Sequence, residues 1–215
     1  PNRLPKQEIS PDLAEALWLR LRTASRQLHP FASWEFRTPQ GGHGRIGRGP
    51  VTKQITGEPG ELLMWVYGRT EAARVEIANW MLDHGADPAR VNSHEGTNAL
   101  HVMFGKREHD YIGEAKLLQR FLDGGADINL KAPKWNVPIR TMLDNYGLSD
   151  KELGPFYDVI FSYPGIDWDI IVGKAFGKPV TLKEYVDLDA KQHPDLHRRM
   201  HDYLQHGPSP RPEFN

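Results

Sequence analysis

The chain has 215 residues, which is enough for one large domain or for about four or five helical repeats of roughly 33 to 47 residues. Its 28 acidic side chains nearly balance its 27 basic ones, which excludes a strong overall field toward nucleic acid or an anionic membrane. The chain has no cysteine, so disulfides and thiolate metal sites are excluded, and no apolar run approaches the roughly 18 residues of a membrane span. We therefore expect an intracellular, cytoplasmic protein that binds neither nucleic acid nor membrane.

The first 60 residues differ in character from the rest. Ser10-Pro11-Asp12 is typical of a helix start, because serine caps the N-terminus and proline suits the first helical position, so we expect a capping helix there. The glycine-rich run over residues 41–50 cannot hold a helix. We expect it to form a long loop, or the loop of a small hairpin with strands near residues 34–38 and 51–55. The run lacks the Lys-Ser/Thr ending of a phosphate-binding loop, so no nucleotide cofactor is predicted.

From about residue 61 to residue 207 the sequence is periodic. Gly85-Ala86-Asp87 recurs as Gly125-Ala126-Asp127 and is echoed as Gly165-Ile166-Asp167, at intervals of 40 residues. Two apolar segments separated by a turn precede each tripeptide, which predicts a pair of helices whose second member ends at the glycine in a left-handed conformation. A fourth unit closes at His206-Gly207. The pattern predicts four stacked helix pairs over residues 61–207, followed by a tail over residues 208–215.

The second of these units resembles an ankyrin repeat. Residues 96–101, Gly-Thr-Asn-Ala-Leu-His, are similar to the opening of such a repeat, and residues 117–129 are similar to its close. The resemblance covers residues 61–207 and implies an all-α, ankyrin-like solenoid of about four helix pairs, preceded by the N-terminal capping helix and the partly extended, Gly-rich segment. It also implies that His101 has a structural role, because the family keeps a histidine there that hydrogen-bonds across units.

The loops after the three tripeptides form the candidate partner-binding surface. In ankyrin-like stacks these loops project as fingers beside a concave face. Tryptophan and arginine are favoured in binding hot spots, although a tryptophan at the base of a finger can instead cover the neighbouring repeat. The candidate partner-binding residues are Arg90, Asn92, His94 and Glu95 in the first finger, Lys131, Lys134 and Trp135 in the second, and Trp168, Asp169 and Lys174 in the third.

Three histidines near the C-terminus are a candidate metal site. His193, His197 and His201 recur every four residues, so they lie along one face of the expected final helix, where imidazoles at this spacing bind zinc or nickel. The His-Glu-x-x-His pattern is missing, and Arg198 and Arg199 add positive charge. The sequence therefore favours a polar outer surface of a terminal cap over a metal site.

The sequence predicts a module that binds another protein and has no chemistry or cofactor of its own. One specific form of this role is an inhibitor or immunity protein that neutralises a toxic enzyme. The alternative is an enzyme whose site lies at the junction of the N-terminal segment and the first repeats, where Trp34, His43, Arg45 and Arg48 would meet His94 or Glu95. No catalytic residues are assigned, because no nucleophile motif such as Gly-x-Ser-x-Gly accompanies the histidines.

Overall fold

The computed structural model describes residues 33–37, 43–46, 52–55, 71–83, 85–145, 147–175 and 177–214. The expected capping helix after Ser10 and the expected first helix of the first unit lie outside these residues. Within them the protein is mostly helical, and none of the described helices is long and apolar enough to cross a bilayer. The seven described helices are α3 (Glu71–Asp83), α4 (Ala99–Phe104), α5 (Tyr111–Asp123), α6 (Pro138–Leu143), α7 (Asp150–Ile160), α8 (Leu182–Leu188) and α9 (Pro194–His206).

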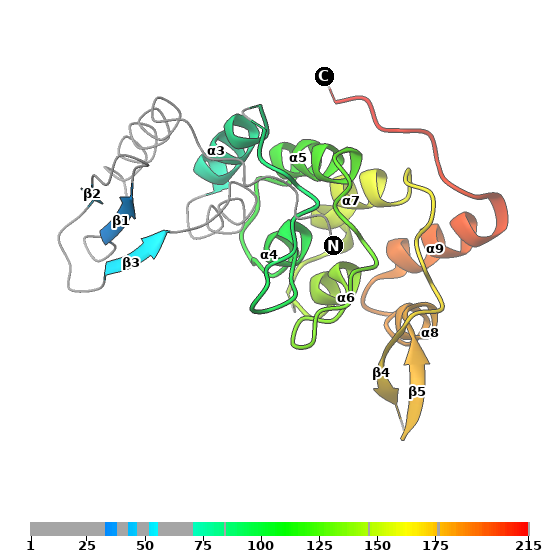
Figure 1. Ribbon diagram of the computed structural model, residues 1–215. Coiled ribbons are helices and arrows are strands. Elements are labelled where there is room, and N and C mark those ends of the chain that lie inside the picture. Colours follow the sequence, from blue (N-terminus) through cyan, green and yellow to red (C-terminus); the bar gives the residue numbers. More distant parts are fainter. Residues whose placement is uncertain are drawn as a thin grey trace, which may run out of the picture.

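The longer helices pack side by side in chain order (Figure 1). Helix α3 packs on α5, α5 on α7, and α7 on α9. The shorter helices lie on one side of this row, where α4 packs on α6 and α8 packs on α9. Segments that correspond in the repeated sequence therefore lie next to one another in space.

Helix α5 shows how the sequence builds this row. Asp110 accepts a hydrogen bond from the Gly113 backbone N–H and so caps the first turn, and the helix ends before Gly124. Because α5 lies between α3 and α7, its apolar side chains are buried over most of its circumference; they are Ala115, Leu117, Leu118, Phe121 and Leu122. Helix α9 packs on one side and buries Leu196 and Met200.

A buried charged cluster joins α3 to α5. Arg74 donates to Oε1 of Glu114 from Nε at 3.0 Å and from Nη2 at 2.7 Å, and His109 Nδ1 lies 2.5 Å from Oε2 of the same carboxylate. The second ring nitrogen of His109, Nε2, lies 2.9 Å from the Lys106 carbonyl and must donate to it. Glu114 is fully buried, and its two partners are almost fully buried, so both oxygens of an enclosed carboxylate are satisfied.

Two small sheets correct the prediction of an all-α fold. Strands β1 (Ser33–Arg37), β2 (His43–Ile46) and β3 (Thr52–Ile55) form a sheet in the order β2-β1-β3. The strands expected near residues 34–38 and 51–55 are present, but they pair in parallel and are not a hairpin; β2, within the run expected to be a loop, pairs antiparallel with β1.

The second sheet is an antiparallel hairpin of β4 (Ile171–Ala175) and β5 (Lys178–Thr181), which projects away from the helices (Figure 1). Pro179 and Val180, in the segment where the fourth helix pair was predicted, lie in β5. Helix α8 begins after Thr181, whose hydroxyl accepts from the Glu184 backbone N–H while the Glu184 carboxylate accepts from the Thr181 N–H.

The predicted C-terminal tail turns back along the row of longer helices (Figure 1). The backbone N–H of Ser209 donates to the Phe161 carbonyl at 2.9 Å, and Arg211 pairs with Asp123 at 2.8 Å. Phe214 is partly buried against the hydrophobic core. The tail therefore covers the ends of α5 and α7.

Candidate functional site

The three repeated tripeptides share a glycine with positive φ, but only the first two end a helix in the same way, because α7 ends at Ile160, before Gly165. Gly85, Gly125 and Gly165 all have positive φ, at 85°, 92° and 82°. The N–H of Gly85 donates to the Leu82 carbonyl, and the N–H of Gly125 donates to the Leu122 carbonyl. Helices α3 and α5 therefore end with the same hydrogen bond. The following Ala86, Ala126 and Ile166 are buried, and each aspartate accepts a backbone N–H two residues further on.

Each turn leads into a loop that folds back on itself, and the first two loops are built alike. In the first, Asn92 pairs with residues 96 and 97 through two backbone hydrogen bonds; in the second, Ala132 and Asn136 exchange two at 2.8 Å. Gly96 and Asn136 occupy the same place and both have positive φ, 69° and 64°. The third loop extends into the β4–β5 hairpin. We call these segments (residues 88–98, 128–137 and 168–181) the loop surface.

Side chains of one loop donate to backbone carbonyls of the next. Between the first and second loops, Asn98 Nδ2 donates to the Asp127 carbonyl at 2.7 Å, and an added Cβ at Gly96 would meet Pro133 at 3.2 Å. Between the second and third, Asn136 Nδ2 donates to the Val172 carbonyl and Lys131 Nζ to the Ile171 carbonyl, both at 2.5 Å. The three loops therefore form one continuous surface.

His101 supports this surface from below, as the sequence predicted. The ring is fully buried, its Nδ1 lies 3.2 Å from the Asn98 backbone N, and its Nε2 lies 2.8 Å from the Asn136 carbonyl of the second loop. The Asn136 carbonyl requires a proton on Nε2, whereas Nδ1 lies 2.8 Å from Asn98 Oδ1 as well, so its partners fit either a lone pair or a proton there. Burial lowers the pKa of His101 although its hydrogen bonds oppose this effect, which favours the neutral ring.

Exposed side chains recur at one position of the three loops, and we call this set of three the column. Val91, Lys131 and Ile171 lie at the same position of successive loops, and all three are exposed; Val91 retains 39% and Ile171 49% of its accessible surface. The described residues have three further exposed large apolar side chains, which lie in or near helices: Ile112, Leu188 and Leu204. The forty-residue period could have identified these three positions, because aligning the repeated units is enough to place them in register.

The residues predicted to bind a partner differ in their exposure to solvent. His94, Glu95, Lys131, Lys134, Asp169 and Lys174 are exposed, whereas Arg90 and Asn92 are partly buried. Asn92 has a structural part, since its Oδ1 accepts from the backbone N–H groups of residues 94 and 95. Trp135 is half-buried, and its ring lies against Gly105, where an added Cβ would approach Cζ3 to 2.7 Å.

The assignment of Trp168 to the binding surface is wrong. Its side chain is 4% exposed and stacks on Phe161, with ring centroids 5.8 Å apart and planes 11° apart. Tyr203 of α9 meets the same indole edge-on at 6.1 Å. Trp168 therefore belongs to the core between the third turn and the last helix.

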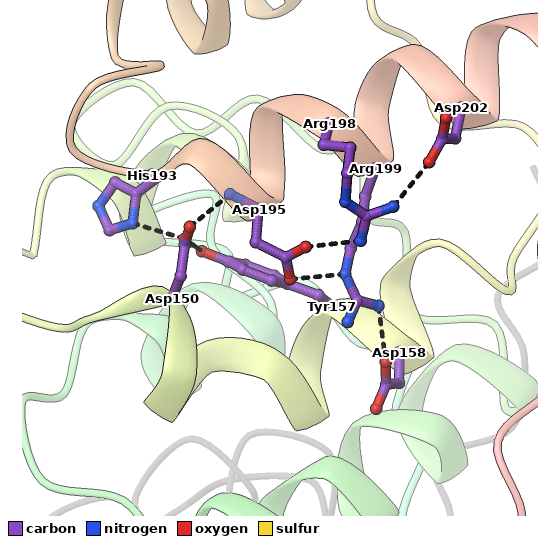
Figure 2. A network of polar contacts seen from close by, with 8 residues as sticks. All are labelled: Asp150, Tyr157, Asp158, His193, Asp195, Arg198, Arg199 and Asp202. Carbon is purple, nitrogen blue, oxygen red and sulfur yellow. Dashed lines mark hydrogen bonds and ion pairs between the residues drawn. The ribbon is translucent and has the colours of Figure 1, made fainter.

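The three C-terminal histidines do not converge on one point. His193 is therefore not part of a metal site with His197 and His201. Figure 2 shows His193 turned toward Asp150, with Nδ1 3.1 Å from Oδ1, and Tyr157 donating to the same oxygen at 2.9 Å. Burial, reinforced by Asp150, raises the pKa of Tyr157 well above its usual range, so the hydroxyl keeps its proton. His197 and His201 instead face Asp187 of α8, which sequence reasoning missed.

Ion pairs continue this network along α9 and hold it on α7 (Figure 2). Arg199 pairs with Asp158 at 2.6 Å and with Asp195 at 2.8 Å, and Arg198 pairs with Asp195 and Asp202. Burial alone would raise the pKa of Asp195, but the two arginines outweigh it and hold that pKa below its usual value. Both arginine charges that the sequence placed beside the histidines are thus compensated by carboxylates.

Comparison with known proteins bears on the fold alone. No protein-family model and no curated protein matches the chain. Among solved structures, it is similar to a crystal structure described as that of a functionally unknown protein from Leptotrichia buccalis C-1013-b. The two share 29% sequence identity with a TM-score of 0.54, over 67% of this chain and 75% of that chain. This likeness supports a mostly helical fold.

Proposed function

We propose that the helices and turns described above are an ankyrin-like repeat array whose task is to bind another protein through the loop surface. One observation carries the proposal: side chains of each loop are hydrogen-bonded to the backbone of the next, and the exposed Val91–Lys131–Ile171 column lies on these linked loops. The recurrence of a positive-φ glycine, a buried residue and a capping aspartate in all three tripeptides supports the repeat assignment.

The links favour binding because they reduce its entropic cost. A loop that is already ordered loses less conformational freedom on association than one that must be fixed by the partner. Apolar side chains that remain exposed on an ordered surface gain the most from being covered. Val91 and Ile171 meet both conditions, and Lys131 between them is held by its bond to the Ile171 carbonyl.

The tips of the second and third loops are basic. Lys134 lies at the tip of the second loop, and Lys174 and Lys178 flank the turn of the hairpin, and all three are exposed. Carboxylates lie at the base of the loops, where Asp127 and Asp167 bond backbone N–H groups. We expect a partner that places apolar side chains over the column and acidic ones near the tips.

An inhibitor or immunity protein is a specific form of this function, since a single array of small size suits one dedicated target. Its mark would be one partner in a fixed ratio, whereas a general adaptor would capture several. The enzyme alternative stays a prediction, because the side chains of Trp34, His43, Arg45 and Arg48, which it requires, lie outside the described part of the structure.

The column is tested by the double variant Val91→Ser, Ile171→Ser. The matched control is Ile112→Ser, Leu204→Ser, which removes two exposed apolar side chains away from the loop surface. In quantitative affinity capture from native lysate, the column variant should retain less than about a tenth of the specific partner, since buried interface anchors often contribute 2 kcal/mol or more each. The control should retain all of it, and circular dichroism should be unchanged for both.

Equal loss in both variants, or full retention by the column variant, would contradict the proposed surface. Trp168 is unsuitable for this test, because replacing it would leave a cavity beside Phe161 and Tyr203 and lower stability for a reason unrelated to binding.

A further inference from the structure

Three potential metal ligands converge between α8 and α9. Nε2 of His201 lies 3.0 Å from Oδ1 of Asp187, Nε2 of His197 lies 3.2 Å from the same oxygen, and the two ring nitrogens are 3.1 Å apart. The three atoms form a nearly equilateral triangle. Among the described residues, these are the three potential ligands that lie close enough together to bind one metal ion.

We propose that Asp187, His197 and His201 bind a divalent transition-metal ion, for which Zn²⁺ is the best fit. Zinc is held by imidazole nitrogen and carboxylate oxygen at about 2.0 to 2.2 Å in tetrahedral geometry, which separates neighbouring ligand atoms by roughly 3.3 Å. The observed separations are within a few tenths of an ångström of this value. An ion above the triangle would therefore bind all three atoms with small side-chain adjustments.

Ordinary hydrogen bonding explains this geometry less well. If both rings donated to Asp187, their two N–H hydrogens would crowd each other, because the nitrogens are as close together as either is to the oxygen. If one ring presented a lone pair, it would be in the form that binds a metal. Imidazole and carboxylate, without thiolate, favour Zn²⁺ or a similar borderline ion over Ca²⁺ or Mg²⁺, which prefer oxygen alone.

The surroundings are compatible with a cation. The guanidinium groups of Arg198 and Arg199, next to His197 in sequence, are ion-paired with Asp195, Asp158 and Asp202. The site itself has one carboxylate, which offsets half of the dication's charge. Between 35% and 41% of each ligand side chain is exposed, so the ion could enter from solvent and keep a position for water or for a side chain of a bound protein.

Bound zinc would clip the last two helices together. Asp187 lies in α8, whereas both histidines lie one turn apart on α9, a helix that packs on a single side. A ligand that binds the folded state alone stabilises it by mass action, so the ion should raise the melting temperature. At about a hundredfold excess over the dissociation constant, the rise should be on the order of 5 °C.

The test uses the full chain stripped with a chelator and titrated with Zn²⁺ by isothermal calorimetry, with thermal melts in parallel. The parent should bind one ion per chain. His197→Ala, His201→Ala and Asp187→Asn should each weaken binding by more than the roughly 10- to 100-fold that loss of an outer-shell partner causes. All three replace exposed side chains, so the fold should persist, and far-ultraviolet circular dichroism checks this.

Two matched controls remove similar groups from the same helix. His206→Ala and Asp202→Asn change an exposed imidazole and an exposed carboxylate of α9 outside the triangle, and both should bind zinc like the parent. Co²⁺ provides a second readout, since a tetrahedral site gives it an intense visible spectrum that His201→Ala should abolish. The assignment is overturned if zinc fails to saturate a single site, or if Asp187→Asn and His201→Ala bind it as tightly as the controls.

Discussion

Carboxylates bind arginine in two regions of this protein, with very different degrees of burial. Between α3 and α5, in the middle of the row, Glu114 is fully enclosed and serves both Arg74 and His109. Between α7 and α9, at the C-terminal end, Asp195 serves Arg198 and Arg199 with about a third of its side chain exposed. The chemical groups are the same, but water compensates a lost partner only in the second case.

The difference follows from position in the row. A side chain enclosed between two packed helices has no route to solvent, so its polar groups must be satisfied by protein atoms. The last helix of the row has a solvent-exposed side, so its charges can form a solvated network there. Stability should therefore depend strongly on the middle cluster and weakly on the terminal one.

The largest effect is expected for the buried carboxylate. Glu114→Ala should lower the free energy of unfolding by about 3 to 5 kcal/mol, because it removes the buried counter-charge of the enclosed Arg74 guanidinium and a hydrogen-bond partner of His109. Asp195→Ala, its counterpart at the end, should cost about 1 kcal/mol or less. Urea denaturation of the three proteins measures both values, and equal losses would show that burial does not separate the two regions.

The turn glycines offer an intermediate test. Gly125 and Gly207 both have positive φ, at 92° and 80°, and both end a helix. Gly125→Val should cost about 1 to 2 kcal/mol, because a β-branched residue is strained there and the helices on either side prevent adjustment. Gly207→Val should strain the backbone more, since Gly207 also has ψ −167°, a combination of angles essentially restricted to glycine. Thermal melts would contradict this contrast if the two shifts coincided.

The smallest effects concern pH. The buried His101 and the terminal network at Asp195 should change stability in different pH ranges. The pKa of His101 is lowered from 6.5, so below pH 6.5 the unfolded chain binds a proton that the folded protein refuses. Stability should therefore fall as the pH drops below 6.5, by at most about 1.4 kcal/mol per pH unit for one proton. His101→Gln should remove this slope, whereas the exposed-site variant His94→Ala should keep it.

The pKa of Asp195 is lowered from 3.8, which has the same consequence for the terminal network in a more acidic range. Its contribution is complete above pH 3.8 and is lost as the pH falls through the lower, folded-state value. Denaturation at a series of pH values separates the two effects. A parental slope near pH 6 that persists in His101→Gln would assign it to another group.

Much of the periodic part could be predicted from the sequence. The spacing of the tripeptides located the ends of α3 and α5, because a glycine after an apolar helix is a local signal that does not depend on the rest of the fold. The buried role of His101 followed from its place in the repeat. The hairpin β4–β5 was missed, although β-branched residues on both sides of Gly177 carried a signal for it.

The remaining errors concern contacts between distant segments. Trp168 was assigned to the surface because its loop was expected to project from the helices. Tyr203 of α9, far along the chain, instead helps to bury it. The metal candidates were chosen from one helix by their spacing, whereas the third convergent ligand, Asp187, comes from α8. Spacing within one helix predicts a shared face but not the side chain that an adjacent helix places opposite it.

The direction of the links between loops has a consequence for how this protein can change. One link ends on a side chain, where Asn129 Oδ1 accepts from the Asp167 backbone N–H, but the others end on main-chain oxygens of the next turn or loop, at positions 127, 165, 171 and 172. All twenty amino acids supply a main-chain oxygen, so these receiving positions tolerate substitution of their side chains as far as these bonds are concerned. The outward residues are thus free to diversify while the framework persists, which makes the surface a suitable starting point for selecting new specificities from a library.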